Sequence, residues 1–348
     1  VGPLVITLMI FAVTGSLLVL ALVGGDENIL RAVSNIGLSI GLNAISIFVT
    51  LIVLGFFILG LVGWKILRWI GKSYKEKKIS DQTVMADSFI LIFGIVQSIT
   101  LSFEGSLWIL SGIASFLVFK TITIIGFKNK KFDNNKFVPK LLLLRVFSLG
   151  KRSEKLFDKL ARYWRHVGSI QLISGPDLAT TTVEPHEFLD FIGGRLSRQF
   201  IGSSEVLEEH ISIMDVKADS DLRYRVNEYF CYEDTWKVVL SRLATENDVV
   251  LMDLRGFNKD NDGCKYEIYE ILNLRPVNNI VFITDSTTNE DYLNDIMLDA
   301  WNNINADSPN ITLSFDQVQI YRLNTTSSPE FNSLLKLIFR SVESHDKN

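Results

Sequence analysis

The sequence predicts a membrane bundle of about four α-helices joined to a cytosolic α/β domain, a doubly wound parallel sheet of the flavodoxin-like class. Three observations predict this. Long uncharged runs fill residues 1–127, charge is divided unevenly along the chain, and short apolar runs alternate with amphipathic ones beyond residue 140. The expected parts are a transmembrane region over 1–127, a basic linker over 128–140 and the α/β domain over 141–348.

The charge distribution separates the two halves of the chain. Residues 1–140 hold 13 basic and 7 acidic side chains, whereas residues 141–348 hold 22 basic and 32 acidic ones. This division excludes a purely soluble enzyme and a disordered chain. The acidic second half also argues against direct nucleic-acid binding, which needs a basic surface. Two cysteines and four scattered histidines give neither a disulfide framework nor metal-ligand spacing, so no metal site is predicted.

Four membrane spans are expected, over about 3–25, 36–64, 86–103 and 105–127. The first two lie in uncharged runs longer than the roughly 20 apolar residues that a spanning helix needs. A signal peptide is the alternative for the first run, but its apolar stretch exceeds the usual length of about 7–15 residues. The last two spans are short and are separated only by Glu104, which predicts a tight hairpin. A re-entrant or interfacial hairpin is the alternative there.

The loops predict the orientation. Six basic residues follow the second run and six follow the fourth, whereas the loops after the first and third runs carry only Asp26, Glu27, Arg31 and Glu104. By the positive-inside rule the basic loops are cytoplasmic. We therefore expect a multi-pass protein of the plasma (inner) membrane with its C-terminal domain in the cytosol. Gly37 and Gly41 are small residues four positions apart, and so are Ser111 and Ser115. Small residues at this spacing let two helices approach closely in lipid. Both packing within one chain and a homo-oligomer interface fit this spacing.

The cytosolic half alternates expected strands and helices. Strands are expected over 141–148, 169–174, 249–254, 280–284 and 318–323. Helices are expected over 153–166, 185–201, 235–244, 264–274, 290–304 and 329–342. Apolar strands that alternate with helices imply a parallel sheet covered on both faces. Residues 210–216 and 224–232 fit either strands or an ordered insertion.

Candidate ligand-binding residues follow from the ends of these strands, because ligands bind open α/β sheets beyond the carboxyl ends of the strands. They are Ser148, Lys151, Arg152, Ser174, Asp177, Asp253, Arg255 and Asp285. Lys151 and Arg152 open a predicted helix, where a phosphate is attracted. Neither a P-loop nor a G-x-G-x-x-G segment follows any expected strand. The alternative is that Ser, Asp and Gly simply suit loops and helix caps.

One segment carries a resemblance to a known family. After the expected strand at 249–254 the chain reads Asp262-Gly-Cys-Lys-Tyr-Glu267. This resembles the TIR and SEFIR (STIR) domains, in which a helix opening with Trp-Cys-x-x-Glu follows a strand. The glutamate is catalytic in the NAD-cleaving members, and Glu267 is the matching position; Gly263 stands where the family usually has Trp. Nucleoside deoxyribosyltransferase-like domains carry a similar Gly-x-x-x-Glu and also act on an N-glycosidic bond. The resemblance implies a Rossmannoid fold, NAD or a related nucleotide as ligand, and bacterial signalling or antiviral defence.

Glu267 can also be judged from its place on the helix. The apolar face is formed by Cys264, Ile268, Ile271 and Leu272, and at about 100° per residue Glu267 lies at the margin of that face. A carboxylate at such a margin can have its pKa shifted, and it can stabilise the oxocarbenium-like state of glycosidic cleavage. Two alternatives remain open. Glu267 either only suits the positive end of the helix dipole or contacts a ligand without catalysis.

Three functions are therefore expected. The first is a membrane-anchored signalling or defence enzyme that cleaves NAD or a related nucleotide. The second is a non-enzymatic sensor in which ligand or partner binding drives oligomerisation of the membrane helices and perturbs the bilayer. The third is a docking scaffold whose acidic domain binds a protein partner. The sequence leaves the identity of the ligand open.

Overall fold

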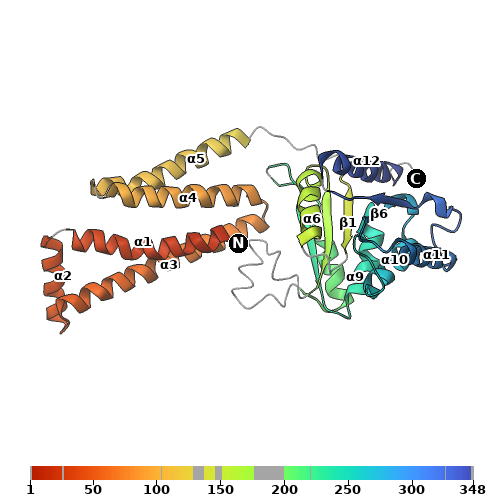
Figure 1. The fold of residues 1–348 in the computed structure, drawn as a ribbon. Helices are drawn as coiled ribbons and strands as arrows, with labels where there is room; N and C mark the ends of the chain where they lie inside the picture. The colour runs from red at the N-terminus through yellow and green to blue at the C-terminus, as the bar shows by residue number, and fades with distance from the viewer. Residues whose placement is uncertain are drawn as a thin grey trace. The chain divides into compact units, whose positions relative to one another are not determined.

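The structure is a computed structural model of the 348-residue chain. It describes residues 2–25, 27–102, 104–127, 137–145, 151–175, 200–219, 221–325 and 327–345. The chain divides into two compact units, one formed mainly by residues 1–132 and the other mainly by residues 133–348. Figure 1 shows helices alone in the first unit and a sheet with helices packed against it in the second.

The first unit contains five α-helices and one 3₁₀ turn in its described part. They are α1 (Gly2–Gly24), α2 (Glu27–Ser39), α3 (Ala44–Lys75), α4 (Asp81–Ser102), η1 (Ser106–Leu110) and α5 (Ser111–Phe127). Three described stretches are long and apolar enough to cross a membrane: Ala44–Tyr74, Gln82–Leu101 and Leu107–Gly126. Leu8–Gly24 and Glu27–Ser39 meet the same criterion only as a pair, bent by 101° at their junction.

The expected span over 36–64 is wrong at its beginning, because the uncharged run is divided between α2 and α3. Gly41 ends α2 with a left-handed φ of 80°. The amides of Gly41 and Leu42 donate to the carbonyls of Leu38 and Gly37, at 3.2 and 2.8 Å. This is the Schellman ending that glycine favours. Asn43 then caps α3, because its side-chain oxygen accepts from the amide of Ser46 at 2.8 Å. An apolar pattern alone does not reveal such a turn.

Glycines set how closely the helices of the first unit pack. A Cβ placed on Gly15 of α1 would lie 1.9 Å from the carbonyl oxygen of Gly55 in α3. A Cβ on Gly112 of α5 would lie 2.0 Å from the carbonyl oxygen of Gly94 in α4. Each helix pair therefore touches backbone to backbone, as small residues permit in lipid. Gly37 also packs within the chain, against Ile47, whereas Gly41 lies in the turn.

The second unit is built on a parallel sheet, which confirms the predicted α/β class. The described strands are β1 (Lys140–Arg145), β2 (Ser169–Ser174), β3 (Phe200–Ile201), β4 (Val226–Cys231), β5 (Val249–Asp253), β6 (Ile280–Thr284) and β7 (Gln319–Arg322). Their order is β3-β4-β2-β1-β5-β6-β7, and every neighbouring pair is parallel.

Helices cover both faces of this sheet (Figure 1). Leu141 and Leu143 of β1 face α6 (Lys151–Trp164) and α12 (Ser328–His345). Leu142 and Leu144 face the opposite way, toward a core that also holds side chains of four other helices. Those helices are α8 (Ser204–Ser212), α9 (Trp236–Glu246), α10 (Asp262–Leu274) and α11 (Glu290–Asn302). Short 3₁₀ turns, η4 (Val277–Asn279) and η5 (Phe315–Gln317), precede β6 and β7. Burial on both faces explains why the strands are apolar throughout.

Of the two interpretations of residues 210–216, the strand is wrong, because α8 extends over Ser204–Ser212. Ser203 caps that helix by accepting from the amide of Val206 at 3.4 Å, and Leu207 packs into the core. The strand reading of 224–232 is confirmed by β4. The expected helix over 185–201 is wrong at its end, where Phe200 and Ile201 form β3 beside β4. The rest of that expected helix, and residues 146–148 of the first expected strand, lie outside the described residues.

The strand order creates a place beside β1 from which two connections run to opposite sides of the sheet. From β1 the chain proceeds to β2 on one side, whereas β4 is followed by β5 on the other side of β1. The carboxyl ends of β1 and β5 therefore border the crevice in which open α/β sheets bind ligands.

We predict that Gly55→Ala destabilises the α1–α3 pair. Alanine in a helix interior gains about 1 kcal/mol over glycine. However, the new Cβ would lie 2.5 Å from the carbonyl oxygen of Gly15. Such overpacking typically costs about 1–3 kcal/mol. Gly126→Ala is the matched control, because a Cβ there meets nothing within 4 Å. Thermal unfolding of the full-length protein in detergent should show a lower midpoint for Gly55→Ala only. Equal midpoints would contradict the close packing.

Candidate functional site

Four charged side chains meet at the carboxyl edge of β1, β5 and β6, and we refer to them as the charged cluster: Arg152, Asp253, Arg255 and Asp285. Arg152 lies in the first turn of α6, which follows β1 along the chain. Asp253 ends β5, Arg255 follows two residues later, and Asp285 comes directly after β6. The cluster therefore lies at the crevice between the diverging connections.

Asp253 and Arg255 form a buried pair with two parallel hydrogen bonds. The Nε and Nη2 atoms of Arg255 donate to the two carboxylate oxygens of Asp253, each at 2.7 Å. The Ser153 hydroxyl donates to Asp253 at 3.2 Å, and Arg255 also donates to the Arg152 carbonyl at 3.3 Å. Both side chains are almost fully buried, at 1% and 5% exposure. This geometry fixes the loop after β5 against the first turn of α6.

Arg152 and Asp285 form the second ion pair of the cluster. Arg152 also donates to the Thr287 hydroxyl at 3.3 Å. Asp285 accepts two further bonds from Thr287, from its amide at 2.9 Å and its hydroxyl at 2.6 Å. The Asp285 side chain is buried, whereas that of Arg152 is 47% exposed. Of the two cations in the cluster, Arg152 is the one that reaches solvent.

The pKa directions show that the cluster stabilises its own charges. Burial raises the pKa of Asp285, but hydrogen bonds from Thr287 and the charges of Arg152 and Arg255 outweigh it and lower the pKa. For Arg255, burial acts to lower the pKa. The hydrogen bonds to Asp253 and the charges of Asp253 and Asp285 outweigh this effect, so the pKa of Arg255 is raised. The cluster holds two positive and two negative groups. An incoming anion must therefore compete with a carboxylate for Arg152.

Glu267 lies on α10 and is more deeply buried than the margin that its helical position predicts. It is only 4% exposed, and among the described residues its Oε2 atom has no hydrogen-bond partner. Burial raises the pKa of Glu267 to about 8, while the Cys264 thiol acts in the opposite direction. The pKa of that thiol is itself raised by burial and by the charges of Glu267 and Asp253. Cys264 is thus the group through which Glu267 and Asp253 are related, since both carboxylates act on its thiol.

The other predicted residues are not all brought together. Ser174 is buried at the end of β2, and its hydroxyl donates to Glu228 of β4, a polar pair separate from the cluster. Lys151 is the first residue of α6, where only its backbone is described. Ser148 and Asp177 lie outside the described residues. Among the eight predicted ligand-binding positions, the structure thus joins Arg152, Asp253, Arg255 and Asp285.

Two site residues were missed by sequence reasoning: Thr287 and Thr288. The Thr288 hydroxyl accepts from the Asp285 amide at 3.1 Å and donates to the Leu254 carbonyl at 3.0 Å. It therefore ties the loop after β6 to the loop after β5. The sequence feature that could have indicated both threonines is the run Asp285-Ser-Thr-Thr288 directly after a buried strand. Hydroxyl residues that follow an aspartate favour hydrogen-bonded turns. In the described part of the chain no group of three or more His, Cys, Asp or Glu side chains is placed to hold a metal ion.

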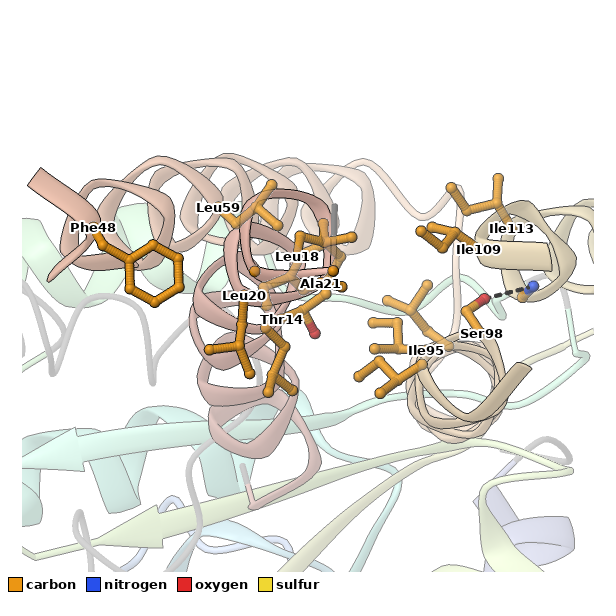
Figure 2. Close-up of a pocket in the computed structure, with 17 residues that line it drawn as sticks. Thr14, Leu18, Leu20, Ala21, Phe48, Leu59, Ile95, Ser98, Ile109 and Ile113 are labelled. Atoms are coloured by element: carbon orange, nitrogen blue, oxygen red, sulfur yellow. Dashed lines mark hydrogen bonds between the residues drawn. The ribbon is translucent and has the colours of Figure 1, made fainter. Parts of the chain in front are cut away.

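A separate cavity of about 880 Å³ lies among the apolar helices of the first unit. Figure 2 shows side chains of α1, including Thr14 and Leu18, facing Ile95 and Ser98 of α4 across it. The Ser98 hydroxyl accepts from the Gly112 amide at 2.8 Å, the dashed contact in Figure 2. None of the described residues that line this cavity has an ionisable side chain. A cavity with this lining fits a hydrocarbon chain and offers no acid or base for catalysis. The charged cluster is therefore the stronger candidate site.

We predict that Asp253→Ala strongly destabilises the α/β unit. Removing one partner of a buried ion pair leaves an uncompensated charge and costs about 3–5 kcal/mol. Glu290→Ala is the control, because its partner Arg322 is exposed and such pairs contribute about 0–1 kcal/mol. Urea unfolding of the full-length protein, followed by tryptophan fluorescence, measures both. A loss below 1 kcal/mol for Asp253→Ala would contradict the buried pair.

We also predict that Glu267 makes stability depend on pH. Its folded-state pKa of about 8 exceeds the ordinary value of 4.5, so between these values the folded state holds a proton that the unfolded state lacks. Stability therefore falls as pH rises from about 5 through about 8. Glu267→Gln cannot ionise and should remove this decline, whereas exposed Glu290→Gln should keep it. Thermal midpoints at pH 5 to 9 measure the effect; parallel curves for wild type and Glu267→Gln would refute it.

No protein-family model matches this chain, and no curated protein or solved structure matches it significantly. The candidate site is therefore defined by its own geometry. A solvent-reaching guanidinium and three buried charges lie together at the carboxyl edge of a parallel sheet, and α10, which follows β5, carries a buried carboxyl with a raised pKa.

Proposed function

We propose that this is a membrane-anchored signalling or defence protein whose α/β domain binds an anionic nucleotide, NAD or a relative, at the charged cluster. The observation that carries the proposal is the position of Arg152. Its half-exposed guanidinium lies at the crevice between β1 and β5, in the first turn of a helix. Helix N-termini and guanidinium groups are both favourable partners for phosphate.

The hydrogen bonds around Asp285 support an exchange in which Arg152 turns to a phosphate. Asp285 accepts from the Thr287 amide and hydroxyl, and the charge of Arg255 also acts on it. When Arg152 leaves, Asp285 keeps these partners, so no buried carboxylate is left uncompensated. Arg152 can then offer a phosphate two parallel N–H donors.

The strand order supports the flavodoxin-like and TIR-like assignment. The run β2-β1-β5-β6-β7 has the 2-1-3-4-5 order of flavodoxin-like sheets, and β4 and β3 extend it beyond β2. The Gly-Cys-x-x-Glu segment opens α10 directly after β5 and its loop, where the resemblance expects it. The apolar helices and the two basic loops support a multi-pass inner-membrane protein with this domain in the cytosol.

Cleavage of the bound nucleotide is a second candidate function, favoured by the unpartnered, buried carboxyl of Glu267. A cationic pyridinium beside it would favour the ionised form, because an opposite charge lowers a carboxyl pKa. In such a reaction the C–N bond breaks with its electron pair going to the nitrogen. Water attacks the ribose carbon, and ionised Glu267 accepts the proton of that water. A non-enzymatic sensor or docking scaffold needs no such step.

The test is nucleotide binding to the full-length protein in detergent, read as a rise in thermal midpoint with NAD and a panel of nucleotides. A ligand at 100 times its Kd stabilises the folded state by about 2.7 kcal/mol. Arg152→Ala should weaken binding at least tenfold. Arg242→Ala is the matched control, because Arg242 pairs with Glu208 and Glu246 on the helices of the opposite face.

Release of the free base, measured in the same samples, separates the candidates. Turnover that Glu267→Gln abolishes, with binding retained, supports cleavage. Binding without turnover supports the sensor. If no nucleotide shifts the midpoint, or if Arg152→Ala binds as well as Arg242→Ala, the proposed nucleotide site is wrong.

A further inference from the structure

The position of α2 between two apolar helices determines how it can meet the bilayer. α1 has 23 residues, which at about 1.5 Å per residue is long enough to cross the roughly 30 Å hydrocarbon core. α3 begins at Ala44 and runs back antiparallel, with Gly15 and Gly55 in contact. The end of α1 and the beginning of α3 therefore lie at the same membrane face. A helix that joins them at 101° to α1 lies along that face.

The residues of α2 divide into an apolar and a polar arc. At about 100° per residue, Ile29, Val33, Ile36 and Gly37 fall on one side of the helix, and Glu27, Arg31 and Asn35 fall on the other. Glu27 and Arg31 are strongly exposed and pair with each other at 3.2 Å. This is the pattern of helices that lie in the plane of a membrane interface.

The protein covers only part of the apolar arc. Gly37 is buried against α3, where an added Cβ would lie 2.8 Å from a methyl carbon of Ile47. In contrast, Ile29 and Ile36 are 42% and 59% exposed. Leu38 is exposed on the polar side of α2, and Ile40 and Ile45, close to the turn into α3, are also exposed. These side chains adjoin the lipid-facing surfaces of the two flanking helices, so hydrocarbon of the same bilayer is the partner that covers them.

We propose that α2 is an interfacial helix that binds the outer leaflet of the bilayer. Ile29 and Ile36 insert into the upper acyl region, and the Glu27–Arg31 pair lies among the headgroups. This inference rests on the proposed membrane placement of α1 and α3. Because α2 carries one acid and one base that pair with each other, the contact is hydrophobic and does not require anionic lipid.

The test uses spin labels on single cysteines in the full-length protein, reconstituted into phosphatidylcholine vesicles. Ile36→Cys and Arg31→Cys are a matched pair on opposite arcs, and Ile29→Cys with Asn35→Cys repeats the comparison. The native thiols Cys231 and Cys264 are buried, so the unsubstituted protein measures background labelling. Power saturation with oxygen and with a water-soluble nickel chelate reports the depth of each label.

Labels at 36 and 29 should be accessible to oxygen and protected from nickel, and labels at 31 and 35 should show the reverse. Nickel accessibility at all four positions would overturn the proposal, and so would protection at all four. Val118→Cys, exposed near the middle of α5 and away from the cavity, tests the membrane placement itself and must be protected from nickel. Nucleotide binding by the same variants is measured separately, so failure of this inference is distinguishable from failure of the nucleotide site.

Discussion

The pairing of β1 with β5 is the constraint on which the α/β unit depends. These strands are about one hundred residues apart in the sequence, yet Leu141 to Arg145 lie in parallel register with Val249 to Asp253. Only this pairing brings the first turn of α6, which follows β1, next to Asp253. Both strands are buried on both faces, so the hydrophobic effect holds the pair together and the polar groups meet only where the strands end.

The charged cluster shows how a polar site is tolerated at the edge of an apolar core. Buried charges are costly unless they are paired and hydrogen-bonded, and Arg255 and Asp253 satisfy each other through two bonds. The hydroxyl groups of Ser153, Thr287 and Thr288 complete the network. Glu267 differs, because burial without a full set of partners raises its pKa instead. Perturbed groups of this kind gather at functional sites, which is the physical basis of the proposed chemistry.

In the first unit, the apolar helices touch backbone to backbone, which is the kind of packing by which helices associate in lipid. Gly15 with Gly55 and Gly94 with Gly112 let the helices touch. Asp87 of α4 and Lys120 of α5 add an ion pair between the helices of the second pair. Charged groups in apolar surroundings are costly unless they are paired, so this ion pair favours α4 and α5 as neighbours. The sequence shows both charges but not that they meet.

The sequence by itself determined the two-part architecture, because uncharged runs and alternating buried strands are local patterns that hydrophobicity dictates. It also placed Arg152, Asp253, Arg255 and Asp285 at strand ends, since parallel strands share one edge. It did not determine the turn at Gly41, the helix at Ser204–Ser212 or the separate pairing of Ser174 with Glu228. The turn at Gly41 and the helix α8 rest on local hydrogen bonds that an apolar pattern does not reveal. Tertiary structure decided the pairing of Ser174 with Glu228 and the depth of Glu267, because these depend on which distant segments pack together. That information lies in no single stretch of residues.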